Sequence, residues 1–192
     1  MWRAILVLPR MRYGTVRPTM RSEEGSGRRL ALIRLARTFV PDIAQVHGVT
    51  RVALIGSLTT TKQDPKDIDL LITVEPIADL APLACHARRL MGAAQSLGKG
   101  ADVFLADPDG NYLGRVCQWK VCRAGVRLRC DALHCGQRPH LHDDLEAVRL
   151  PVALIRSPPV ILWPEARCNE PAPADLEQGL LRSLPVAFTV RL

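Results

Sequence analysis

Three aspartates stand at positions where paired carboxylates are able to do chemistry. Asp67 and Asp69 occupy alternate positions at the start of the apolar run DIDLLITV, and Asp102 lies in a later apolar run, ADVFLA. Residues two apart on a β-strand point to the same face, so the side chains of Asp67 and Asp69 should project together. Two adjacent carboxylates repel each other unless a cation lies between them. The pattern predicts either a divalent metal site or, as the simpler alternative, a solvent-facing strand end.

The predicted metal is Mg²⁺ or Mn²⁺, because hard oxygen ligands suit these ions and Mg²⁺ is usually held by one or two carboxylates together with substrate phosphates. With Asp102 on the neighbouring strand, two ions about 3.5–4 Å apart would fit, which is the arrangement used in phosphoryl and nucleotidyl transfer. Asp67, Asp69 and Asp102 are therefore the candidate metal ligands and catalytic residues.

A phosphate-binding turn is expected just before the paired aspartates. The apolar run RVALI ends at Gly56 and Ser57. A glycine lets the backbone approach a phosphate closely, and a following serine offers both a hydroxyl and an amide. Lys62 and Lys66 lie in the loop that leads to Asp67, where they are able to neutralise phosphate charge. These four residues are the candidate nucleotide-binding residues.

The elements that position these residues are read from hydrophobic periodicity and turn signals. The pattern predicts a helix over residues 26–46 and then two strands, over 51–57 and 67–74. A second helix over 78–96 and a third strand over 101–106 follow. This order favours an α+β fold (α/β-like) with a mixed sheet flanked by helices. A hairpin is predicted over residues 119–130, and two short extended pieces are predicted around Pro158-Pro159.

The chain of 192 residues divides into four predicted segments. We expect a disordered leader at residues 1–25, a core at 26–110, a small basic Cys- and His-containing extension at 111–166, and a loosely ordered tail at 167–192. The net charge of +7 is concentrated in residues 1–22 and in residues 114–139. Such a basic surface is able to attract nucleic acid, and a solvated basic face is the alternative. No apolar run is long enough to span a membrane. We expect a cytoplasmic protein with no membrane partner.

The extension contains two cysteine pairs. Cys117 and Cys122, then Cys130 and Cys135, are followed by His140 and His142. Zinc favours four thiolate or imidazole ligands, so the four cysteines are candidate ligands of a structural Zn²⁺. Small buried thiols on a hairpin are the alternative, since cysteine is readily buried. For the sequence HLHDD at residues 140–144, a helix capped by an aspartate is favoured over a metal or proton-transfer site.

The spacing of the first motif resembles that of the polymerase-beta-type nucleotidyltransferase superfamily, and especially its small stand-alone bacterial members. An apolar residue precedes Gly56-Ser57, nine residues follow, and then Asp67 and Asp69 alternate with apolar residues. The resemblance covers roughly residues 50–106. One difference is that many small members carry an Arg-Gly pair shortly after Gly-Ser, where this chain has LTTTKQDPK.

The resemblance implies a nucleotidyltransferase fold and a transfer of NMP from an NTP to a hydroxyl, with release of pyrophosphate. It assigns the phosphates to Gly56 and Ser57, the metals to Asp67 and Asp69, and metal binding with acceptor activation to Asp102. The acceptor is a nucleic acid end, a protein or a small molecule, and the basic extension slightly favours the first. A helical partner protein or a homodimer is expected to complete the site. The alternatives are an inactive nucleotide- or RNA-binding module of the same fold and a zinc-stabilised interaction module.

Overall fold

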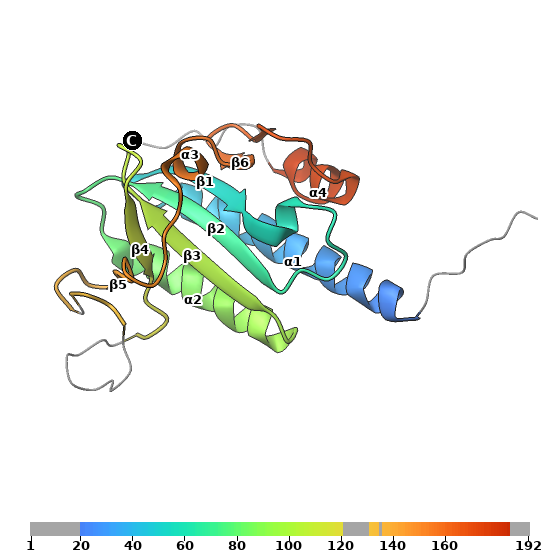
Figure 1. The fold of residues 1–192 in the computed structure, drawn as a ribbon, viewed down its shortest axis with the longest axis horizontal. Helices are drawn as coiled ribbons and strands as arrows, with labels where there is room; N and C mark the ends of the chain where they lie inside the picture. The colour runs from blue at the N-terminus through green and yellow to red at the C-terminus, as the bar shows by residue number, and fades with distance from the viewer. Residues whose placement is uncertain (1–19, 121–130, 135, 185–192) are drawn as a thin grey trace, which may run out of the picture.

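The protein was analysed as a computed structural model, which describes residues 20–120, 131–134 and 136–184. Within these ranges seven strands form one mixed sheet in the order β5-β4-β3-β2-β1-β6-β7 (Figure 1). The strands are β1 Val49–Ile55, β2 Asp67–Val74, β3 Gly100–Ala106, β4 Tyr112–Val116, β5 Leu141–His142, β6 Val160–Trp163 and β7 Arg167–Cys168. The β2–β3 pair is parallel, and each other neighbouring pair is antiparallel.

The two longest helices pack side by side against one face of the sheet (Figure 1). They are α1 Met20–Ala44 and α2 Leu80–Ser96, and the shorter helices are η1 Gly56–Thr59, α3 Val152–Arg156, α4 Ala174–Gly179 and η2 Leu181–Ser183. Alternation along β2 decides which side chains meet the long helices. Ile68, Leu70 and Ile72 are fully buried in the core shared with α1 and α2, so Asp67 and Asp69 point to the other face.

The opposite face of the sheet is covered only in part. A smaller cluster of Ala53, Ile55, Leu71 and Phe104 is closed by Ile155 of α3. This cover lies over the later residues of β2 and β3, so the residues that face this side at the start of both strands remain half-buried. The fold therefore leaves the aspartates accessible at the edge of an otherwise buried surface.

Most of the predicted core elements are confirmed, and the fold is α+β. Strand β2 has the predicted bounds, β1 and β3 lie within a residue or two of them, and Asp79 caps α2 through the amide of Ala81. The first helix is longer than expected. It begins at Met20, inside the expected leader and before the predicted start at residue 26. Residues 1–19 and 121–130, with most of the predicted hairpin, lie outside the described residues.

The second half of the chain differs more from expectation. The extension at 111–166 supplies β4, β5 and β6 to the same sheet, and β6 pairs with β1. Of the two predicted extended pieces, the first is helix α3 and only the second is a strand, β6. Residues 167–184 of the expected loose tail are folded, because Leu176 and Leu180 are buried in the main core beside α1.

Among the described residues, no helix combines the length and the apolar character needed to cross a membrane.

Candidate active site

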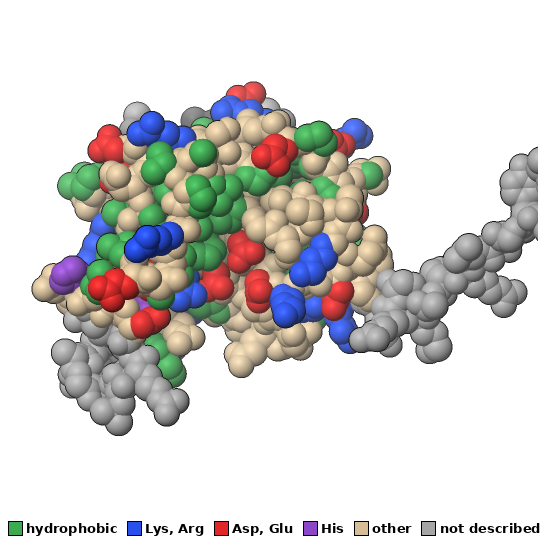
Figure 2. All heavy atoms as spheres, in the orientation of Figure 1, with side chains coloured by type: hydrophobic (Ala, Val, Ile, Leu, Met, Phe, Trp, Pro, Cys, Tyr) green, Lys and Arg blue, Asp and Glu red, His purple; other side chains and the backbone are tan. Residues whose placement is uncertain are grey.

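The three predicted aspartates come together at the start of the parallel pair β2–β3. Asp69 lies opposite Asp102 in the register of the two strands, and Asp67 lies opposite Gly100. A Cβ atom at Gly100 would fall 2.2 Å from Oδ1 of Asp67, so the absence of a side chain there makes room for that carboxylate. Acidic side chains are visible near the middle of the face shown in Figure 2, with basic side chains around them.

Gly56 lies directly against the carboxylate of Asp69. It directly follows β1 and has a φ of 73°, in the left-handed region that favours glycine. A Cβ atom built on Gly56 would stand 2.0 Å from Oδ2 of Asp69 and 3.0 Å from its Cβ. The predicted phosphate turn and the predicted metal ligand are thus in van der Waals contact, and this contact requires a glycine.

Replacement of Gly56 by alanine should disturb the site more than the backbone strain alone explains. Gly98 is a matched control, because its φ is 68° and a Cβ atom there would have no neighbour within 4 Å. Both Gly56→Ala and Gly98→Ala should lose about 1–2 kcal/mol for the left-handed backbone. Only Gly56→Ala should also displace Asp69. Chemical denaturation would detect the additional loss of stability, and a Mn²⁺ binding measurement would detect the disturbed carboxylate. Equal losses in both variants, with equal Mn²⁺ binding, would contradict the contact.

The environment of Asp69 is unfavourable for a lone carboxylate. Burial, with added repulsion from Asp102 and Asp67, raises the pKa of Asp69 from 3.8 to about 6. A bound divalent cation would reverse the effect, because a nearby positive charge stabilises the ionised carboxylate. A raised pKa at Asp69 is therefore what a cation site would show when the carboxylates are considered without the cation.

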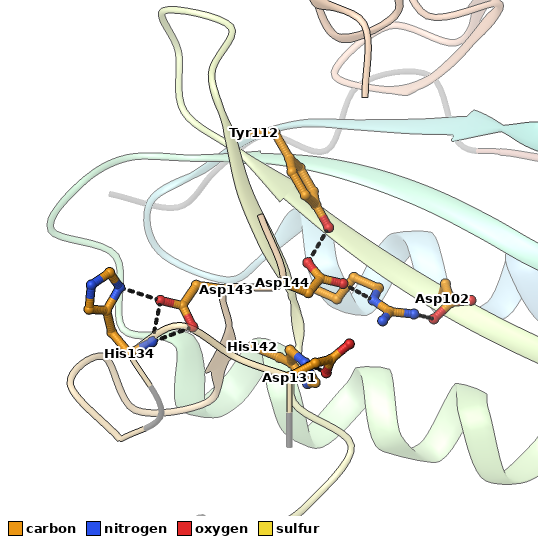
Figure 3. Close-up of polar contacts among 8 residues, drawn as sticks. Asp102, Tyr112, Asp131, His134, His142, Asp143 and Asp144 are labelled. Atoms are coloured by element: carbon orange, nitrogen blue, oxygen red, sulfur yellow. Dashed lines mark hydrogen bonds and ion pairs between the residues drawn. The ribbon is translucent and has the colours of Figure 1, made fainter. Parts of the chain in front are cut away.

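Asp102 is linked to a polar network that the sequence did not indicate. Arg115 on β4 donates from Nη1 to Oδ1 of Asp102 at 3.1 Å and from Nε to Oδ2 of Asp144 at 2.6 Å. The hydroxyl of Tyr112 donates to the other oxygen of Asp144 at 2.8 Å. Figure 3 shows this chain of contacts running from Tyr112 through Asp144 to Asp102. Arg115 thus holds one oxygen of the third aspartate in place.

The charges of this network depend on one another. Asp144 is fully buried, and its negative charge is compensated by Arg115. Burial lowers the pKa of the Arg115 guanidinium, but Asp144 and Asp102 outweigh this effect, and the net shift is upward. Burial and the hydrogen bond to Asp144 raise the pKa of the Tyr112 hydroxyl. The tyrosine therefore remains a neutral donor.

The HLHDD segment does not begin a helix, because Leu141–His142 forms β5 and a turn follows the segment. Asp143 accepts hydrogen bonds from the amide of His134 and pairs with its Nδ1, while His142 pairs with Asp131 (Figure 3). The favoured capping interpretation is therefore wrong, because both aspartates are buried and serve as acceptors between loop and strand.

The phosphate turn is a single short helical turn, in keeping with its run of β-branched threonines. The Thr59 hydroxyl donates to the carbonyl of Gly56, and the amide of Thr60 donates to that of Ser57. Lys62 and Lys66 are exposed on the loop that follows. Their carbonyls hold the loop, because that of Lys62 accepts from Arg29 and that of Lys66 accepts from the amide of Gly100.

Arg29 of α1 anchors this loop through hydrogen bonds to its carbonyl groups. It is buried, donates to the carbonyls of Leu58 and Lys62, and forms a 2.6 Å ion pair with Asp175 of α4. The arginine thus ties the phosphate turn to two helices. Neither Arg29 nor Asp175 stands out in the sequence, because Arg29 is one of several arginines along a helix and Asp175 lies in a segment without a motif.

Loss of Arg29 should therefore weaken the fold. Arg29→Met leaves two carbonyls and a partly exposed carboxylate without their donor, and we expect a loss of about 2 kcal/mol in the free energy of unfolding. Arg34→Met, at an exposed position of the same helix, is the matched control and should change it by less than about 0.5 kcal/mol. Urea denaturation would measure both. A loss no larger in Arg29→Met than in the control would show that the anchor is not needed.

The metal predictions have different outcomes. Among the described residues, no group of three or more His, Cys, Asp and Glu side chains is arranged to hold a metal ion by itself. The magnesium site at Asp67, Asp69 and Asp102 stays a prediction, and Asp102 is paired with Arg115. Of the candidate zinc ligands, Cys117 is buried. Cys122, Cys130 and Cys135 lie outside the described residues, so the zinc site stays a prediction.

Comparison of this chain with protein-family models, with curated proteins and with solved structures gives no match.

Proposed function

We propose that this protein is a metal-dependent nucleotidyltransferase that moves an NMP from an NTP to a hydroxyl group and releases pyrophosphate. The observation that carries the proposal is the contact between Gly56 and the carboxylate of Asp69, with Asp102 next to Asp69 across the parallel strands. This contact would put a phosphate bound at the turn beside paired carboxylates. Such a combination is suited to chemistry at a phosphoryl group.

The environment of Asp69 is suited to a magnesium ion. A carboxylate whose pKa is raised by burial and by two other carboxylates is a group that a divalent cation would stabilise. Mg²⁺ needs only one or two protein carboxylates when substrate phosphates complete its coordination. Asp67 and Asp69 would hold it, and the ion would supply charge stabilisation to the transferring phosphate.

The chain itself supplies orientation and a proton acceptor. The amides of Gly56 and Ser57 would bind phosphate oxygens of the NTP, and Lys62 and Lys66 would reduce the charge nearby. Because Arg115 binds Oδ1 of Asp102, the proposal assigns the proton of the acceptor hydroxyl to Oδ2. The hydroxyl oxygen then bonds to the α-phosphorus, and the bond from that phosphorus to the bridging oxygen of pyrophosphate breaks.

The direct test uses each of the four α-labelled NTPs with Mg²⁺ or Mn²⁺ and with either total RNA or a cell lysate. The wild-type protein should transfer label to an acceptor, and Asp67→Asn should not. Asp109→Asn also removes one negative charge, but in the exposed turn after β3. It is the control and should retain transfer. The labelled species would identify the acceptor class. Equal labelling by wild-type protein and by Asp67→Asn would mean that the proposed site does not carry the reaction.

A non-catalytic nucleotide- or RNA-binding module of the same fold is the second candidate. The 3.1 Å ion pair between Arg115 and Asp102 favours this second candidate, because Arg115 already pairs with the carboxylate that the reaction would use. This candidate predicts nucleotide binding that survives Asp67→Asn and no label transfer by any variant.

A further inference from the structure

A pocket of about 540 Å³ opens beside Asp102, on the side away from the phosphate turn. It lies between α2 and the β4–β5 segment, and its polar lining includes Arg88, Gln95, Asp102, Arg115, Gln118 and His142. The volume is in the range of small-ligand sites. The pocket forms because β4 pairs with β3 only from Phe104 onward, so the earlier residues of β3 border the space instead of a strand.

The strand order places this pocket and the phosphate turn on opposite sides of the aspartates. Gly56 follows β1, Asp69 belongs to β2, Asp102 belongs to β3 and Arg115 belongs to β4, and these strands are consecutive neighbours in the sheet. An NTP at the turn and a second molecule in the pocket would therefore approach the carboxylates from two sides. That geometry suits the pocket to an acceptor rather than to the NTP.

Arg88 is the cation of this pocket that has no acidic partner among the described residues. Its guanidinium donates to the carbonyl of Cys117 at 2.8 and 3.0 Å and contacts Nδ1 of His140 at 3.1 Å. The other cationic lining residues differ in this respect. Lys99 pairs with Asp64, and Arg115 pairs with Asp102 and Asp144.

A half-buried arginine whose charge no described carboxylate neutralises favours an anionic ligand, and an arginine suits phosphate in particular because its planar donors match phosphate oxygens. The pocket also has amide side chains at Gln95 and Gln118 that are able to bind polar groups of a sugar or a base. A carboxylate at its inner wall, Asp102, would repel a phosphate there but would accept a hydroxyl proton.

We propose that the pocket binds the acceptor, and that the acceptor carries both a phosphate, bound by Arg88, and a hydroxyl, directed at Asp102. This inference rests on the proposed function and names the substrate class of the same site. Two sources share this chemistry, a free nucleoside monophosphate and the end of a nucleic acid strand. In the reaction the acceptor oxygen gains the bond to the α-phosphorus, its proton passes to Asp102, and pyrophosphate leaves.

Arg89 provides a matched control for Arg88. It is the next residue of α2, is exposed, and lines a different hollow between α1 and α2 with Leu35 and Asp42. Arg88→Gln and Arg89→Gln lower the net charge of the protein by the same amount, so a difference between them reports on the pocket. Arg88→Lys keeps the charge and tests whether the charge or the packing of the arginine matters. Thermal unfolding of each variant would establish that it is folded.

The probes are adenosine, adenosine 5′-monophosphate and a 5′-phosphorylated uridine trinucleotide, with binding measured by equilibrium dialysis without metal or NTP. We expect the phosphorylated probes to bind better than adenosine. Arg88→Gln should weaken their binding by about tenfold, the effect of one charge-assisted hydrogen bond. Arg89→Gln should not change it, and Arg88→Lys should restore part of it. Tighter binding of the trinucleotide than of the monophosphate would favour a strand end as the source.

Two results would overturn the inference: failure of both phosphorylated probes to bind wild-type protein at millimolar concentration, or equal binding by Arg88→Gln and Arg89→Gln. The proposed function can fail independently of it. Phosphate binding that depends on Arg88, without label transfer in the activity test, would retain the pocket and reject the reaction. Label transfer with the same acceptor KM in Arg88→Gln and Arg89→Gln would retain the reaction and reject the pocket.

Discussion

Asp69→Asn should abolish nucleotidyl transfer while making the protein harder to unfold at pH 7. The amide is a poor ligand for a hard cation and carries no charge, so transfer should fall by more than about 100-fold. The same change removes a negative charge that the folded protein holds at a cost. Burial and repulsion from Asp102 and Asp67 raise the pKa of Asp69 to about 6, and the asparagine has neither penalty.

The pH dependence of this gain follows from linkage. Because the folded-state pKa of Asp69 lies above the unfolded value of 3.8, the wild-type protein loses stability as the pH rises from about 4 through 6. Asp69→Asn does not titrate there. The two proteins should have similar stability near pH 4 and differ by about 1–2 kcal/mol at pH 7, after allowance for the partial exposure of the carboxylate. Urea denaturation at the two pH values would measure the difference.

Added Mg²⁺ separates this effect from a general gain in stability. A ligand that binds only the folded protein stabilises it by an amount set by its concentration and affinity, so Mg²⁺ with an NTP should stabilise wild-type protein and have much less effect on Asp69→Asn. Asp109→Asn, in the exposed turn, should behave like wild type in both respects. A variant at position 69 that is less stable than wild type at pH 7 would mean that the carboxylate is not under strain.

The sequence was sufficient to predict the part of the site that lies on β2 and β3. The alternation of side chains is visible directly in the sequence of β2. Ile68, Leu70 and Ile72 face the main core, so Asp67 and Asp69 lie together on the opposite face. The position of Asp102 opposite Asp69 depends only on the two strands being adjacent. These contacts are short-range consequences of a regular element, which is why spacing alone predicts them.

The supporting groups were not predictable in this way. Asp144 comes from a segment without periodicity, and its burial depends on an arginine 29 residues earlier and on Tyr112. Asp175 becomes structural only because α4 packs next to α1 and meets Arg29, 146 residues away in the chain. A charged residue in an irregular segment carries no local sign of its partner, so these pairs are visible only once the fold has brought them together.

Arg115→Met should be among the most destabilising single changes in this protein. It leaves the fully buried carboxylate of Asp144 without its cation, and breaking a buried pair in this way costs about 3–5 kcal/mol. Arg149→Met, at an exposed position beyond the network, removes the same charge and should cost less than about 0.5 kcal/mol. Urea denaturation at pH 7 would measure both. A loss below about 1 kcal/mol in Arg115→Met would indicate that Asp144 is compensated by another group.

The double variant Arg115→Met/Asp144→Asn separates the structural role of Arg115 from its role at Asp102. With the buried charge removed, the asparagine still offers an oxygen to the hydroxyl of Tyr112, so the double variant should recover about 1–3 kcal/mol relative to Arg115→Met. Asp102, however, still lacks the donor that holds its Oδ1. If Arg115 orients the proton acceptor, transfer should stay reduced by about 10–100-fold in the stable double variant. If Arg115 serves only to neutralise Asp144, transfer should return together with stability.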